Sequence, residues 1–228
     1  MNTQSEIFKD PRYCKNMEGL AFFGKVNASI SHELKNIMAI ISETAGLLTD
    51  LSEMAKRGNP IELDMLTEST QSIVEEIQRG FTTIRQMNRF SHSVDNPLVS
   101  IDLREILDLV SHLSGYLAFA GRMNIRPVDG DPPQVVTCPF ILQAVVYEAV
   151  VQLFKHAGPG TELDLSIRPC RDSAWQIRIK GRKGKIPADF SVEKIENMAA
   201  SIGVTVQCDP HGDLLKINVP NSALTASS

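Results

Sequence analysis

The feature that most constrains the fold is a pair of long helical stripes near the start of the chain. Apolar residues recur at spacings of three, four or seven along residues 26–51 and again along residues 66–87. Such spacings place them on one face of a helix, in a pattern of coiled-coil type. Gly58-Asn59-Pro60 separates the stripes, because glycine favours a helix C-terminal cap and proline starts the next helix. The sequence therefore predicts a helical hairpin. Its two stripes are Val26, Ile30, Leu34, Ile37, Ile41, Leu48 and Leu51, then Leu66, Ile73, Ile77, Phe81, Ile84 and Met87.

A hairpin of this length leaves apolar surface uncovered. Two helices with broad apolar stripes cannot bury both stripes fully against each other, whereas a second copy would complete a four-helix bundle. We therefore expect a homodimer formed through residues 17–94.

The residues after Pro97 predict shorter and mixed elements. Helical patterns cover residues 101–116, 139–156 and 192–202, and strand patterns cover 124–128, 163–168, 174–179, 204–208 and 214–219. This order predicts an α/β sandwich with helices on one face of a mixed sheet. The expected class is thus α+β. It comprises an N-terminal segment (1–16), a helical hairpin (17–96), an α/β domain (97–220) and a flexible tail (221–228).

Composition excludes several classes of function. The net charge of −4 gives no basic surplus, which argues against a nucleic-acid binder. The four cysteines show no CxxC spacing, so no metal site is expected. The N-terminus lacks the apolar core of a signal peptide, and no apolar run is long enough to span a bilayer. We expect a cytoplasmic protein that does not insert into membranes.

His32 stands on the polar side of the first predicted helix. On a wheel of about 100° per residue it lies about 200° from Ile30, whereas Val26, Leu34, Ile37 and Ile41 lie within about 40°. The ordinary interpretation is a solvated surface histidine. The alternative is a nucleophile that accepts a phosphoryl group. Glu33 could orient or deprotonate the ring, and Asn36 could hydrogen-bond a water or the phosphoryl group. Lys25 and Lys35 could neutralise phosphate charge.

The segment Ser31-His32-Glu33-Leu34-Lys35-Asn36 resembles the H-box of histidine kinases. That motif is a histidine, an acidic residue, two variable residues and then Asn or Thr, on the first helix of a dimeric hairpin. The resemblance implies that His32 is phosphorylated, that Glu33 assists kinase chemistry and that Asn36 assists dephosphorylation of a partner regulator. Ile37 replaces the proline usual in the family.

The second half resembles the family's ATP-binding domain in layout but lacks its chemistry. The helix of the N-box carries Glu148 and Gln152, and the longer Gln side chain suits magnesium poorly. Where the family has Asp-x-Gly-x-Gly, this chain has Gly181, Lys183 and Lys185. Only about four residues separate Pro187 from the next predicted helix, too few for the family's lid. The lysines could form a solvated turn or could hold phosphates by charge alone. We expect ATP and magnesium binding to be lost, so that no cofactor remains.

These features predict a phosphotransferase that passes phosphoryl groups between His32 and an aspartate on a response-regulator receiver domain. Such transfer depends on positioning and charge neutralisation. Three alternatives remain open: an ATP-dependent histidine kinase with a divergent nucleotide site, a scaffold that transfers nothing, and a regulator phosphatase that depends on Asn36.

Overall fold

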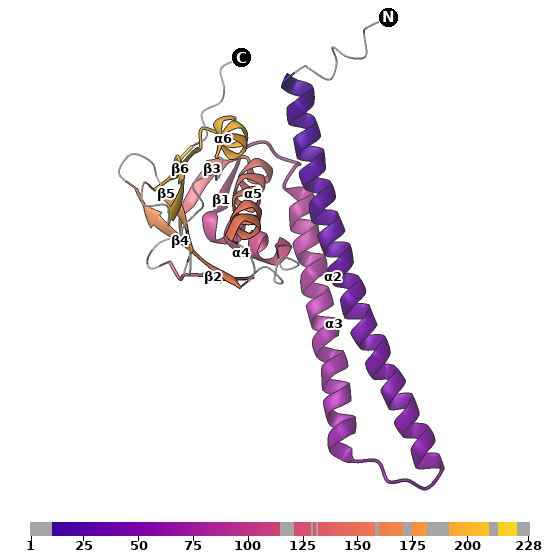
Figure 1. The fold of residues 1–228 in the computed structure, drawn as a ribbon. Helices are drawn as coiled ribbons and strands as arrows, with labels where there is room; N and C mark the ends of the chain where they lie inside the picture. Colours follow the sequence, from indigo (N-terminus) through magenta and orange to yellow (C-terminus); the bar gives the residue numbers. More distant parts are fainter. Residues whose placement is uncertain are drawn as a thin grey trace, which may run out of the picture. The chain divides into compact units, whose positions relative to one another are not determined.

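The computed structural model divides the chain into two compact units (Figure 1). The hairpin unit is Val26–Arg89, and the α/β unit is Met1–Lys25 together with Phe90–Ser228. The structure describes residues 11–114, 121–128, 130, 132–157, 160–170, 175–181, 192–209 and 214–222, with the side chains of 11–18 left aside. Helix α2 (Pro11–Lys56) and helix α3 (Leu63–His92) each contribute to both units.

The turn of the hairpin forms as the glycine–proline break predicts. Gly58 has a φ of 87°, a left-handed conformation that glycine adopts at little cost. Its N–H donates to the Ala55 carbonyl at 2.9 Å, and the Asn59 N–H donates to the Met54 carbonyl at 3.1 Å. These bonds satisfy carbonyls at the end of α2. Helix α2 begins at Pro11, so it extends into the residues expected to precede the hairpin.

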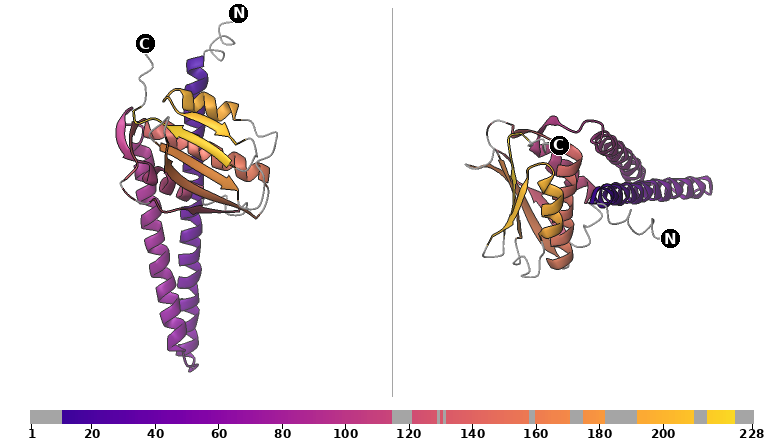
Figure 2. Two further views of the ribbon diagram at one scale, coloured as in Figure 1. Left: turned by 90° about the vertical axis from the view of Figure 1, so that its left-hand side faces the viewer. Right: turned by 90° about the horizontal axis from the view of Figure 1, so that it is seen from above.

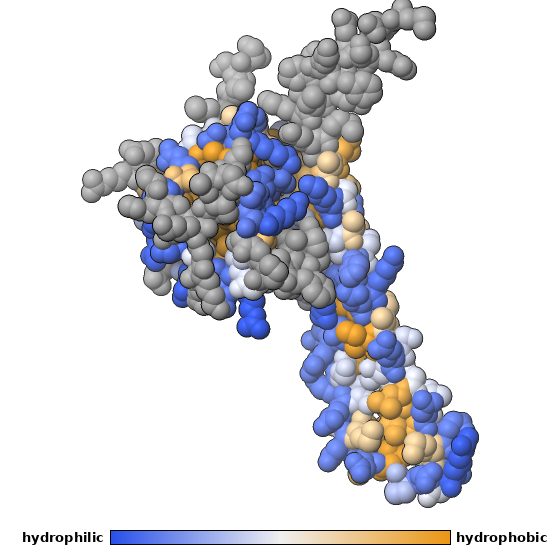
Figure 3. Space-filling view, viewed as in Figure 1, coloured by the Kyte–Doolittle hydropathy of each residue, from blue (hydrophilic) through white to orange (hydrophobic). Residues whose placement is uncertain are grey.

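The hairpin unit buries only a narrow line of apolar side chains. Val26, Ile30, Ile37 and Leu51 are buried, as their stripe predicts. Much of the second stripe is exposed, and Figure 3 shows apolar surface gathered along the outer part of the hairpin. One chain therefore leaves apolar residues of this unit in water. They are Met38, Leu47, Met54, Leu63, Met65, Val74, Ile77, Phe81 and Ile84.

The α/β unit contains a mixed five-stranded sheet in the order β2-β4-β5-β7-β6. The strands are β2 (Gly121–Ile125), β4 (Thr161–Pro169), β5 (Trp175–Gly181), β6 (Thr205–Cys208) and β7 (Leu214–Val219). β2 pairs with β4 in parallel, and the remaining pairs are antiparallel. A separate antiparallel pair joins β1 (Val99–Asp102) to β3 (Gln134–Thr137).

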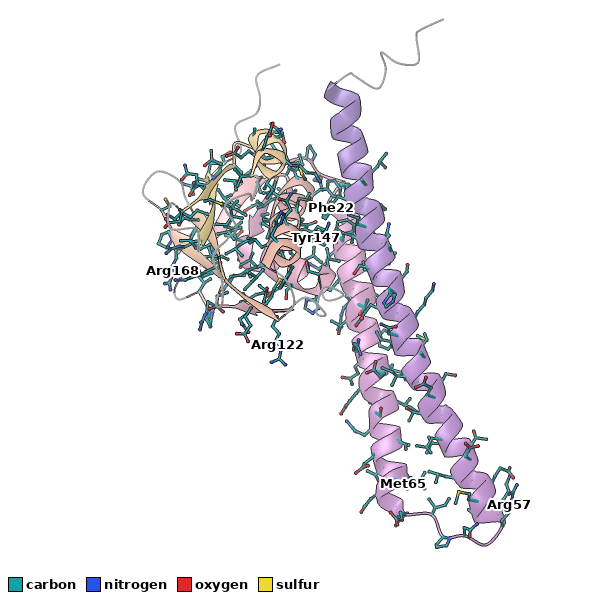
Figure 4. All side chains as sticks on the ribbon, viewed as in Figure 1. Phe22, Arg57, Met65, Arg122, Tyr147 and Arg168 are labelled. Atoms are coloured by element: carbon teal, nitrogen blue, oxygen red, sulfur yellow. The ribbon has the colours of Figure 1, made fainter. Side chains whose placement is uncertain are left out.

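Three helices cover one face of this sheet (Figure 2). They are α4 (Leu103–Leu113), α5 (Pro139–Ala157) and α6 (Glu193–Ala200). α5 is buried along most of its length because nearly every turn carries valine, leucine or an aromatic residue. Tyr147 on α5 lies 5.2 Å from Phe22 between ring centroids, and the two side chains approach each other in Figure 4. Phe22 also meets Phe90 edge to face at 5.4 Å, so aromatic contacts fix the first part of α2 and the end of α3 within this unit.

The predicted α+β class is confirmed, with several boundaries corrected. The helix predicted for 101–116 begins at Leu103, because Asp102 ends a strand and caps the helix by accepting the Arg104 N–H at 2.9 Å. The short strands β1 and β3 were not predicted. The strand predicted for 124–128 lies at Gly121–Ile125 instead.

Candidate functional site: an exposed histidine on the hairpin

His32 is exposed on α2, on the side opposite the buried stripe residues of the hairpin unit. The nearest polar partner of its ring is the Asn36 amide, one helical turn onward, with 3.3 Å between Asn36 Nδ2 and His32 Nδ1. The nitrogen and oxygen of an amide are interchangeable by a flip. With Oδ1 turned inward, Asn36 would accept a hydrogen bond from the Nδ1–H of the neutral tautomer whose lone pair lies on Nε2. The Nε2 atom has no protein partner among the described residues, so it is open to an incoming electrophile.

Glu33 forms an ion pair across the hairpin rather than contacting the neighbouring imidazole. Its Oε1 accepts the Nε–H of Arg79 at 2.9 Å and also a second, closer N–H from Nη2. Arg79 further donates from Nη1 to both carboxylate oxygens of Glu76, at 3.1 Å each. One guanidinium group on α3 therefore joins two carboxylates, one from each helix.

The electrostatics of this cluster favour its charged form. Hydrogen bonding to Glu33 raises the pKa of Arg79 above its usual value, and the charges of Glu33 and Glu76 add to this effect against the opposing effect of burial. The side chains of Arg79 and Glu33 remain 44% and 38% exposed, so solvent screens the pair.

Lys35 is exposed on α2. The structure therefore brings His32 and Asn36 into contact and joins Glu33 to Arg79.

A second cluster of charges lies in the α/β unit around Glu148 on α5. Lys194 of α6 donates to Glu148 Oε1 at 2.9 Å, and the Gln152 side-chain amide donates to the same oxygen at 3.1 Å. The Lys25 ammonium lies 3.7 Å from Oε2. The Glu148 carboxylate, predicted to belong to a degenerate nucleotide site, thus has two ammonium groups of this chain as neighbours.

The balance of forces on Glu148 favours its carboxylate form. Burial raises the pKa of Glu148, but hydrogen bonds from Lys194 and Gln152, together with the charges of Lys194 and Lys25, lower it below its ordinary value. Lys25, predicted to neutralise phosphate at His32, lies beside Glu148 within the α/β unit. The carboxylate is therefore already neutralised by protein groups.

Gly181, Lys183 and Lys185 are the other residues predicted for a degenerate nucleotide site. Gly181 ends β5 and pairs with Leu163 of β4, and Lys183 and Lys185 lie outside the described residues. An apolar pocket of about 770 Å³ in the α/β unit is lined by residues that include Leu20, Phe23 and Phe140, with no ionisable side chain among them. Across the described residues, no group of three or more His, Cys, Asp or Glu side chains could hold a metal ion. Within the same residues, no helix has the length and apolarity needed to cross a membrane.

Structures similar to this chain are histidine kinases or their ATP-binding domains. The Acinetobacter baumannii histidine kinase AdeS matches with a TM-score of 0.46 and 12% identity, over 83% of this chain and 98% of that chain. The ATP-binding domain of PrrB from Mycobacterium tuberculosis matches with a TM-score of 0.44 and 16% identity. The match covers 56% of this chain and 100% of that chain. Histidine kinase ThkA, in a complex with the response regulator protein TrrA, matches with a TM-score of 0.44 and 14% identity. The match covers 95% of this chain and 67% of that chain.

No protein-family model matches the sequence, and no curated protein matches it.

Sequence reasoning missed Arg79 and Lys194. Both pair with carboxylates 46 positions away in sequence, so no local motif contains either pair. The signal available for Arg79 was its place on the second helix, opposite in charge to Glu33 on the first. Folding two predicted helices about Gly58 brings the middle of one near the middle of the other.

Proposed function

We propose that this chain is a histidine phosphotransfer protein of a two-component phosphorelay. His32 exchanges a phosphoryl group with an aspartate on a receiver domain, and the chain itself binds no ATP. The observation that carries the proposal is the exposed imidazole with its Nδ1 beside Asn36 and its Nε2 directed away from protein partners among the described residues. A solvated histidine would satisfy the same exposure, and the adjacent Glu33 and Asn36 make the phosphoacceptor interpretation the better one.

The proposed step balances without a nucleotide. The lone pair of His32 Nε2 forms a bond to phosphorus while the phosphorus–oxygen bond of the receiver's aspartyl phosphate breaks. The electron pair of the broken bond stays on the aspartate, which is released as a carboxylate. The Nδ1 proton remains on the ring beside Asn36 or passes to solvent, and the reverse reaction follows the same path. Lys35 is proposed to neutralise phosphate charge in the complex, and Lys25 is a second candidate. Glu33 is proposed to act on the imidazole through its charge.

The absence of ATP binding is proposed from what surrounds Glu148. Lys194, Lys25 and the Gln152 amide already satisfy this carboxylate, so a magnesium ion would have to displace protein cations. Gly181 stands where the resemblance would require an adenine-reading aspartate. The α/β unit is then proposed to help hold the receiver domain. An ATP-dependent kinase core remains the second candidate because the fold fits it equally well.

The chain is further proposed to act as a cytoplasmic homodimer. The exposed apolar residues of the hairpin unit support this, since Val74, Ile77, Phe81 and Ile84 repeat at helical spacing on α3 and are each at least 43% exposed in a single chain. A second copy presenting the same face would complete a four-helix bundle through a two-fold symmetric interface.

A transfer assay with single-histidine variants tests the proposal. The chain is incubated with a panel of receiver domains carrying labelled aspartyl phosphate, and the label on the chain is tested for acid lability and base stability. Wild type and His92→Ala should acquire label from at least one receiver, and His32→Ala should acquire none. His92 is a matched control because it is an exposed helix histidine, with 78% of its side chain accessible. Label retained in His32→Ala would refute the role of His32.

The same assay separates the rivals. A scaffold predicts that His32→Ala binds the receiver and leaves its phosphorylation unchanged. A regulator phosphatase predicts that receiver phosphate is lost faster in the presence of the chain, and that Asn36→Ala removes this acceleration.

A further inference from the structure

We propose that Arg79 is a positioning residue for phosphoryl transfer at His32, because it holds the Glu33 carboxylate against α3 and limits its action on the neighbouring imidazole. This inference rests on the proposed function. It assigns a role to a residue outside the H-box, and it changes the role expected of Glu33.

The geometry identifies Arg79 as the group that fixes Glu33. Two N–H groups of Arg79, from Nε and Nη2, converge on the single oxygen Oε1 of Glu33. Arg79 Nη1 is itself anchored by both oxygens of Glu76, whose side chain is only 16% exposed. A planar guanidinium held on one side can present its remaining donors in a fixed direction. Glu33 therefore points across the hairpin to α3.

The charge of Glu33 matters because it directly adjoins the nucleophile in sequence. A carboxylate near an imidazole stabilises the protonated ring. Only the neutral imidazole has a lone pair to offer to phosphorus. The ion-paired groups of this cluster are Glu33 from α2 and Glu76 and Arg79 from α3, and Lys35 is also exposed on α2. Arg79 offsets the charge of Glu33 and pairs its carboxylate with α3 across the hairpin.

Asn36 contrasts with Glu33 as a partner for the ring. Its side chain is neutral, and its Nδ2 lies 3.3 Å from His32 Nδ1; with the amide flipped, Oδ1 can accept a hydrogen bond from Nδ1–H without adding a negative charge beside the ring. With Glu33 held by Arg79, Asn36 is the side chain that orients the imidazole. In this division of roles, Asn36 orients the ring and Arg79 holds the Glu33 carboxylate.

The test uses phosphoramidate, a small phosphodonor that needs no partner protein. Nε2 bonds to phosphorus, the phosphorus–nitrogen bond breaks, and its electron pair leaves on ammonia. The rate of phosphohistidine formation is measured against pH, by phosphorus-31 NMR, in the full chain. The variants are Arg79→Ala, Arg79→Lys, and Arg79→Ala combined with Glu33→Gln. Arg85→Ala is the matched control, because Arg85 also lies on α3 and donates to Thr82 rather than to a carboxylate.

We expect Arg79→Ala to raise the pH of half-maximal rate by about half a unit, because an unpaired carboxylate then adjoins the ring. Below that midpoint the rate should fall by about threefold, and at high pH it should equal the wild-type rate. Adding Glu33→Gln should restore the wild-type midpoint. Arg79→Lys keeps the charge but loses the paired donors, so the pH of its half-maximal rate should lie between the values for the wild type and Arg79→Ala. Arg85→Ala should not move the midpoint.

The outcomes separate this inference from the function on which it rests. Failure of the wild-type chain to form phosphohistidine at His32 would overturn both. A labelled wild type with an unchanged pH profile in Arg79→Ala would overturn only the role of Arg79, even if the thermal midpoint fell. Should Arg79→Ala fail to fold, an Arg79→Lys profile identical to that of the wild type would be equally decisive against it.

Discussion

The hairpin unit and the α/β unit differ in how completely they bury their apolar residues. In the α/β unit, large side chains such as Leu107, Leu142 and Tyr147 have no accessible surface. In the hairpin unit, Phe81 is 62% exposed and Leu63 is 77% exposed. Elements that bury their apolar faces within one chain are complete by themselves. Elements that leave such faces exposed need a partner to cover them. His32, the proposed phosphoacceptor, lies on the unit whose apolar face is exposed, and that face is the one proposed to form the dimer.

The charged groups of the two units also differ in how far they are buried. Glu148 is almost enclosed and contacts two lysines and an amide, which leaves little capacity for an external cation. Glu33 and its partner Arg79 are both about two-fifths exposed, so that pair can respond to what approaches the hairpin. The comparison teaches that side chains of the chain itself enclose Glu148, whereas the pair of Glu33 and Arg79 stays partly open to solvent.

The largest effect is expected from a charge placed on the exposed apolar face of the hairpin. Phe81→Asp removes an aromatic contact from each copy of the proposed dimer and buries an unpaired carboxylate there. At about 2 kcal/mol per phenyl ring and two copies, the loss is about 4 kcal/mol, or roughly a thousandfold in the dissociation constant. Analytical ultracentrifugation should show a dimer for the wild type and a monomer for this variant.

The control for Phe81→Asp is Leu98→Asp. Leu98 is also exposed, at 42%, but belongs to the α/β unit. It should leave the dimer intact. Equal loss of dimer in both variants, or a wild-type monomer at every concentration, would contradict the contrast between the units.

Truncation of a leucine should affect the two units unequally. Leu142→Ala removes a fully buried side chain from α5, and the transfer and cavity contributions together should lower the free energy of unfolding by about 3 kcal/mol. Leu63→Ala, at an exposed position at the start of α3, should change it by less than about 0.5 kcal/mol. Urea denaturation followed by circular dichroism measures both. Similar losses would mean that the hairpin is as fully packed as the α/β unit.

The smallest effect concerns the charges around Glu148. Lys194→Met removes a hydrogen bond from a half-exposed ammonium, so its cost should be less than about 1 kcal/mol. The partners of Glu148 hold its pKa below the ordinary value of 4.5, so their stabilisation is present above that pH and is lost as the pH falls below it.

Urea denaturation at several pH values checks this sign. The difference between wild type and Lys194→Met should be measurable at neutral pH and should shrink in acid. Lys155→Met, at an exposed position on the same helix as Glu148, is the control and should show no such pH dependence. If the difference in unfolding free energy between wild type and Lys194→Met grew in acid, the lowered pKa of Glu148 would be contradicted.

The parts of the fold that local chemistry determines were predictable from the sequence. Gly58 and Pro60 locate the turn of the hairpin, and the stripe spacing places His32 on the outer side. β1 and β3 were missed because four-residue strands carry too little alternation to be distinguished from loop. The start of α4 was misplaced because Asp102 serves both as the last residue of a strand and as a helix cap.

The site was predictable to the same extent. His32 and Asn36 stand one turn apart, so their contact follows from helix geometry. The partner of Glu33 did not follow, because Arg79 comes from another helix and its rotation is decided by packing. For the same reason the lysines beside Glu148 could not be found from α5 alone.

The most direct test of the central claim compares two phosphodonors on the same preparation of the chain. One reaction contains labelled ATP with magnesium, and the other contains a receiver domain carrying labelled aspartyl phosphate, with no nucleotide present. The account predicts acid-labile, base-stable label on His32 from the receiver and none from ATP. Label that reaches His32 from ATP alone would contradict it and would make the chain a kinase.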